Sequence, residues 1–160
     1  MVKLTQFSKK NNQSAFSLVE VLLAASILVV AIFVLIELFT YCSPLANSAG
    51  NMGIAINEAQ KILEEIKNTN FDSIATNYAS GGTPGNTFNI SQPTGKGVIY
   101  LDTSNADLIR VDVVICWQNA NGRVIGEDKD LDGLASVSED VNGNGQVDSP
   151  VTLSSFIARR

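Results

Sequence analysis

The chain has 160 residues, with 11 lysine and arginine residues against 16 aspartate and glutamate residues, a formal net charge of −5 and no histidine. Such an acidic chain lacks the basic face that releases counterions from phosphates, so we predict no nucleic-acid partner. The absence of histidine excludes Ser-His-Asp and Cys-His catalysis and most transition-metal centres, and two cysteines are too few for a four-ligand zinc site.

The apolar residues gather near the N-terminus, in residues 16–39. This segment reads FSLVEVLLAASILVVAIFVLIELF and has no charged residue between Val21 and Ile36. As a helix it extends for roughly 36 Å, enough to cross a hydrocarbon core of about 30 Å. Its apolar residues surround the helix instead of forming one stripe, which favours a transmembrane helix over a buried core helix.

A polar segment precedes this helix. Residues 1–15 carry Lys3, Lys9 and Lys10 and no acidic residue. The positive-inside rule keeps such a segment in the cytoplasm and places the C-terminal bulk of the chain across the membrane. A secretory signal peptide is the main alternative, but its apolar core is shorter, about 7–15 residues, and ends at a small-residue cleavage site.

Glu20 interrupts the apolar segment near its start. An ionisable side chain in a membrane span is energetically costly and usually has a partner. An amine created by cleavage before Phe16 would lie about 6 Å along the helix and would be a natural partner, on the same chain or on a neighbouring one. The alternative is that Glu20 extends to the lipid headgroups.

The stretch AFSLVEVLLA at residues 15–24 resembles the N-terminal signal of the type IV pilin-like family, in which mature chains begin with Phe and carry Glu at the fifth position. This chain departs from the family in having Ala15 where Gly is usual. The resemblance implies that prepilin peptidase cleaves between Ala15 and Phe16, and that Phe16 is N-methylated. It also implies that Glu20 pairs with the terminal amine of an adjacent subunit. The mature chain would wait in the inner membrane as a single-pass protein and then join other pilin-like subunits in a periplasmic or surface filament.

Beyond the apolar segment the helix is predicted to continue over residues 40–70, with a kink at Pro44 and an apolar stripe that packs on a sheet. The strings EAQKILEEI (58–66) and FDSI (71–74) also resemble minor pilins of the pilus-modification group. Alternating residues and turn signals predict an antiparallel sheet of three or four strands. The segments with strand signals are 87–90, 98–101, 108–117, 123–125 and 151–158.

The two cysteines are interpreted as small apolar residues and not as a disulfide. Cys42 lies near the end of the apolar span and is expected to face the bilayer. Cys116 lies on a predicted strand and is expected to face the seam between helix and sheet.

Residues 127–148 form an acidic segment, and its first half matches the calcium-loop pattern D-x-[DN]-x-[DN]-G-x5-E from Asp128 to Glu139. Carboxylates at positions one, three, five and twelve and a carbonyl at position seven are the usual ligands. The predicted ligands are Asp128, Asp130, Asp132, the carbonyl of Leu134 and Glu139.

The pattern starts again at once but lacks an acid at its twelfth position, which is Val151. The residues predicted for this second loop are Asp140, Asn142, Asn144 and Asp148. Because the loops abut, we expect them between strands and not in a pair of EF-hands. We predict one or two calcium ions. Calcium accepts six or more oxygens at flexible geometry, whereas magnesium demands a tighter octahedral geometry. A solvated acidic loop without metal is the alternative.

The predicted fold is α+β and pilin-like: a leader (1–15), a transmembrane or filament-core helix (16–39), an outer half of that helix (40–70), and a globular antiparallel head (71–160). The chain offers no catalytic nucleophile or cofactor motif, so we predict no enzyme. The predicted function is that of a minor pilin or pseudopilin, a structural subunit of a type IV pilus or type II secretion filament, stabilised by calcium. The alternative is a single-pass membrane protein with a calcium-binding exported domain that forms no filament.

Overall fold

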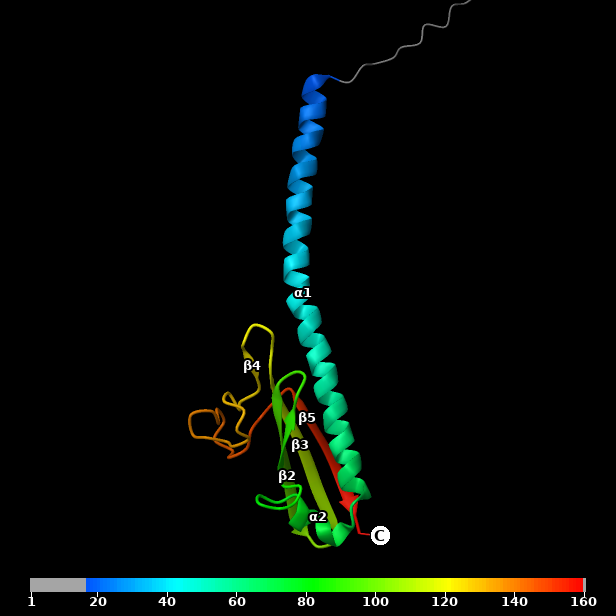
Figure 1. Cartoon of the computed structure of the whole chain (residues 1–160), viewed down its shortest axis with the longest axis vertical. Coiled ribbons are helices and arrows are strands. Elements are labelled where there is room, and N and C mark those ends of the chain that lie inside the picture. Colours follow the sequence, from blue (N-terminus) through cyan, green and yellow to red (C-terminus); the bar gives the residue numbers. More distant parts are fainter. Residues whose placement is uncertain (1–16, 160) are drawn as a thin grey trace, which may run out of the picture. The chain divides into compact units, whose positions relative to one another are not determined.

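The computed structural model describes residues 17–159, and these contain two helices and five strands (Figure 1). The cleavage and methylation site predicted at Ala15 and Phe16 lies outside the described residues. The elements, in chain order, are α1 (Leu18–Asn68), α2 (Phe71–Asn77), β1 (Thr87–Ile90), β2 (Gly95–Asn105), β3 (Leu108–Gln118), β4 (Val124–Ile125) and β5 (Val151–Ala158).

The chain divides into two compact units, residues 1–42 and 43–160, and α1 contributes to both. The described part of the first unit is helical from Leu18, and its large apolar side chains up to Phe39 are between 47% and 76% exposed. By length and composition, α1 is able to span a membrane. The helix continues without interruption through Pro44.

In the second unit an antiparallel sheet has the strand order β1-β2-β3-β4, and β5 also pairs with β3. Strand β3 is central: its residues pair with β2 along one edge and with β4 and β5 along the other. The sheet therefore has five strands, and the predicted count of three or four was too low. Strand β2 is also longer than predicted, because it continues to Asn105 before a tight turn leads into β3.

The main core lies between α1 and one face of the sheet. Four residues of α1 are buried there: Ala55, Ala59, Leu63 and Ile66. They pack against alternate residues of β3, namely Ile109, Val111, Val113, Ile115 and Trp117. The predicted apolar stripe and the predicted strand alternation are both confirmed by this seam.

Cys116 does not face this seam, so that prediction was wrong. It is 1% exposed and packs with Val98, Val114 and Val147 on the other face of the sheet. Successive side chains of a strand point to opposite faces, and Trp117 occupies the helix side, so Cys116 must lie opposite. Cys42 and Cys116 are both free thiols.

The FDSI string forms the start of the short helix α2, which was not predicted from the sequence. Asn70 caps it by accepting a hydrogen bond from the N–H of Asp72 at 3.0 Å. Arg159, just after β5, pairs with Asp72 at 2.7 Å and lies 4.8 Å from the ring centroid of Phe71. These contacts fasten the end of the sheet to α2.

Replacing Ile115 with alanine should destabilise the head by about 2–5 kcal/mol, because the side chain is fully buried and its removal leaves a cavity. Urea unfolding of a fragment spanning residues 43–160 measures the change. Val137→Ala is the matched control, since Val137 is 99% exposed and should change stability by less than about 0.5 kcal/mol. Equal effects at the two positions would contradict the packing described for β3.

Candidate metal centre

The candidate site lies in residues 126–150, between β4 and β5, which we call the β4–β5 segment. It contains no helix or strand and forms the yellow-to-orange loops beside the sheet in Figure 1. Its local shape is set by residues in the left-handed region. Leu131 has φ 59° and Gly133 has φ 84°, and these two conformations turn the chain back on itself around Asp128.

Asp128 is the centre of the first loop and is 0% exposed. One of its carboxylate oxygens accepts the N–H of Asp132 at 3.0 Å, and the other accepts the N–H of Gly133 at 2.9 Å. Its burial therefore comes with hydrogen bonds to both oxygens. Neither bond neutralises the negative charge.

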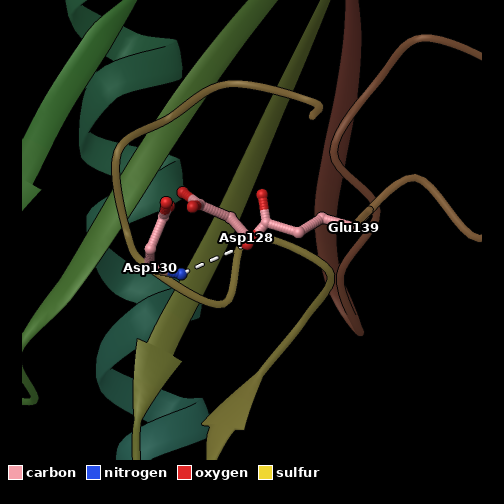
Figure 2. A group of neighbouring side chains, drawn as sticks. All are labelled: Asp128, Asp130 and Glu139. Carbon is pink, nitrogen blue, oxygen red and sulfur yellow. Dashed lines mark hydrogen bonds between the residues drawn. The ribbon is translucent and has the colours of Figure 1, made fainter. Parts of the chain in front are cut away.

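Two further carboxylates approach Asp128. One oxygen from each of Asp128, Asp130 and Glu139 lies within 4.8 Å of the others, and Figure 2 shows the three side chains converging. Glu139 is 7% exposed and receives the N–H of Lys129 at 2.9 Å and that of Asp130 at 3.3 Å. The hydroxyl of Ser136 donates to its other oxygen at 2.6 Å. Three anionic groups thus share one small space.

The other two predicted ligands of the first loop are placed differently. Asp132 is exposed, as Asp130 is, but its carboxylate does not belong to the cluster and accepts the N–H of Leu134 at 2.7 Å. The Leu134 carbonyl accepts the N–H of Ser136 at 3.1 Å. The three carboxylates that the structure brings together are therefore those of Asp128, Asp130 and Glu139.

The second loop repeats the backbone pattern of the first. Asp140 accepts the N–H groups of Gly143 and Gly145, each at 2.7 Å, much as Asp128 accepts those of Asp132 and Gly133. Gly145 has φ 73°, close to the φ of 84° at Gly133, which occupies the same place in the first loop. The chain thus folds two consecutive loops in one conformation.

Three of the four predicted ligands of the second loop, Asn142, Asn144 and Asp148, are in contact through their side chains. Asp148 accepts the side-chain amides of Asn142 at 2.6 Å and Asn144 at 3.1 Å through one oxygen. The amide nitrogens thus point at the carboxylate. Rotating both amides by half a turn would present their oxygens to a cation instead.

Electrostatics differ between the carboxylates. Burial raises the pKa of Asp128, against the opposing effect of the N–H groups it accepts. The Ser136 hydroxyl lowers the pKa of Glu139, and the N–H of Gly145 lowers that of Asp140. Within residues 17–159 no basic side chain forms an ion pair with any of these carboxylates. A bound cation would offset the repulsion, and the all-oxygen donor set suits a hard divalent ion.

The remaining predicted functional residue, Glu20, lies in the first turn of α1 and is exposed. Sequence reasoning did not identify the residues that hold the β4–β5 segment on the sheet. The Tyr100 hydroxyl accepts the N–H of Val147 at 2.7 Å, and Val147 is 2% exposed. The available signal was a single valine near the end of a polar run.

No family model, curated protein or solved structure matches the chain. The assignment of a function therefore rests on the residues and their geometry.

Calcium should raise the melting temperature of the fragment spanning residues 43–160, because an ion that binds the folded state adds about 2.7 kcal/mol at 100 times its dissociation constant. For a domain of this size the shift is roughly 5–15 °C. Calorimetry in calcium, magnesium and chelator measures it, and magnesium should do less.

Glu139→Gln should remove most of that shift by deleting one of the three charges. Glu64→Gln, an exposed position on α1, makes the same chemical change away from the site and should keep the full shift. Identical melting of the unmodified fragment in all three solutions would mean that the β4–β5 segment is an acidic loop without metal.

Proposed function

We propose that this chain is a structural subunit of a pilin-like filament, a minor pilin or pseudopilin of a type IV pilus or type II secretion system. The observation that carries the proposal is the unbroken helix α1, whose first half exposes apolar side chains on all sides while its second half packs on the head. On this proposal the chain has no catalytic role.

The exposed apolar half of α1 requires a non-aqueous surrounding. An apolar surface of this extent is not stable in water. Either a lipid bilayer or a bundle of similar helices would shield it from water. A helix satisfies its backbone hydrogen bonds internally, so it can pass from lipid to bundle without refolding. The same residues thereby support insertion in the inner membrane and later packing in a filament core.

In this proposal Glu20 sets the alignment of each subunit with its neighbour. Once prepilin peptidase has cut before Phe16, the new amine belongs to a residue four positions before Glu20 in the sequence. In a low-dielectric bundle a buried carboxylate without a cation is strongly penalised, so subunits in which Glu20 meets a neighbouring amine are favoured over misaligned ones.

The acidic site fits a head that works outside the cytoplasm. Calcium loops in extracellular modules have dissociation constants of about 10⁻⁴–10⁻³ M, so a weak site fills only after export. We propose that calcium stabilises the head in the periplasm or at the cell surface.

The mature protein should begin at N-methylated Phe16 and lack Lys3, Lys9 and Lys10. Mass spectrometry of the N-terminal peptide from the membrane fraction measures this. Ala15→Gly supplies the residue usual in the family and should be processed at least as well, whereas Ala15→Leu should block cleavage. Intact residues 1–15 in assembled material would contradict the pilin assignment.

Glu20→Gln should leave membrane insertion intact but reduce incorporation into filaments, because the amide keeps the shape of the side chain and removes its charge. Co-purification with other pilin-like subunits measures incorporation. Glu37→Gln is the matched control within the same helix and should incorporate normally. Normal incorporation of Glu20→Gln would favour a headgroup contact, and failure of the unmodified chain to join any filament would favour a single-pass membrane protein.

A further inference from the structure

The sheet face opposite α1 carries a small apolar cluster covered by the β4–β5 segment. Val98, Val114 and Cys116 come from the sheet, and Val147 comes from the segment. All four are at most 3% exposed. In Figure 1 the segment lies on the side of the sheet away from α1. The sheet is therefore covered by α1 on one face and partly by the acidic loops on the other.

Both ends of the segment contact Cys116. A side chain at Gly126, which has φ 110°, would collide with the Cys116 sulfur. At the other end the carbonyl of Asp148 accepts a weak hydrogen bond from the thiol at 3.9 Å. The N–H of Glu127 donates to the same carbonyl at 2.9 Å, which closes the segment into a loop over the thiol.

The apolar contacts that hold this cover are few. Val147 is its buried anchor, and Leu131 and Ala135 pack at the edge of the cluster. Three other aliphatic side chains of the segment, Leu134, Val137 and Val141, are at least 64% exposed. Many of the remaining contacts that shape the segment are made by carboxylates that accept backbone N–H groups, at Asp128, Glu139 and Asp140.

Those carboxylates repel one another unless a cation lies among them. Asp128 follows Gly126 by two residues, and Asp148 belongs to the second loop, so the residues that touch Cys116 are continuous with both loops. Loss of a cation bound there would therefore act on the parts of the chain that cover the thiol. Ser149, whose hydroxyl donates to the Ile115 carbonyl, extends the same cover to the start of β5.

We propose that binding of a divalent cation closes the β4–β5 segment over the outer face of the sheet, and that without the cation the segment opens and exposes Cys116 while the helix–sheet core stays folded. The inference rests on the proposed cation site and adds to it a conformational response. The head would then acquire its complete surface only in a compartment that supplies the ion.

The test uses the full-length chain with Cys42→Ser in detergent micelles, so that Cys116 is its one thiol. A water-soluble maleimide is added in calcium, in magnesium or in chelator, and mass spectrometry follows labelling. If opening releases the ion, calcium at 100 times its dissociation constant slows labelling about a hundredfold relative to chelator. Fluorescence of Trp117, buried on the helix side, reports whether the core stays folded.

Three variants distinguish loss of the cation site from loss of the contacts that hold the segment over Cys116. Glu139→Gln should label rapidly even in calcium, and Glu64→Gln should behave as the parent. Tyr100→Phe removes the acceptor for the Val147 N–H without touching a proposed ligand, so it should speed labelling in calcium while the calcium-induced rise in melting temperature remains.

Calorimetric titration with calcium on the same sample distinguishes the two possible failures. Calcium binding with unchanged Cys116 labelling would contradict the proposed closure of the β4–β5 segment over Cys116, but it would support the cation site. Absence of calcium binding would overturn the site and the cover together. Labelling in chelator that accompanies a loss of the Trp117 signal would also overturn the cover, because the thiol would then be exposed by unfolding of the whole head.

Discussion

The architecture of the head depends on β3, because this strand must be shielded from water on both faces. Along Val113–Trp117 every side chain is buried, as expected for a central strand covered on both sides. Helix α1 supplies the cover for one face through Ala55 and Ala59, whose small side chains let the helix approach closely. The β4–β5 segment supplies the other. The fully buried Asp128 is thus a consequence of the sheet: the loop that carries it must lie down on apolar side chains.

The sequence predicted the parts of this arrangement that are periodic. The helical stripe around Ala59 and Leu63 and the alternation along β3 each point to one structure, and the structure has both. The face occupied by Cys116 was not predictable in the same way. A strand apolar on both faces gives no signal for which side meets the helix, and the answer depends on where Trp117 packs. Helix α2 was missed because seven residues are too few to show a period.

The candidate site likewise has features that the sequence predicted and features that it did not. Loop spacing is local, so the sequence brings Asp128, Asp130 and Glu139 together and repeats the turn at Asp140. Burial is not local. The exposure of Asp132 and the anchoring of Val147 by the Tyr100 hydroxyl depend on the sheet beneath the loops. Pattern matching therefore finds candidate ligands but not which carboxylates are desolvated, and desolvation decides how strongly an ion is needed.

On the proposed function, the first half of α1 and the β4–β5 segment each need a particular surrounding. The exposed apolar half of α1 avoids water, and the carboxylates of the β4–β5 segment require either water or a cation. The core that the second half of α1 forms with the sheet packs without lipid or ion. A subunit built this way can fold its core first, stay anchored by α1, and complete its outer surface when an ion arrives. On that proposal the β4–β5 segment is the part of the head that closes last, because it is held by the fewest apolar contacts.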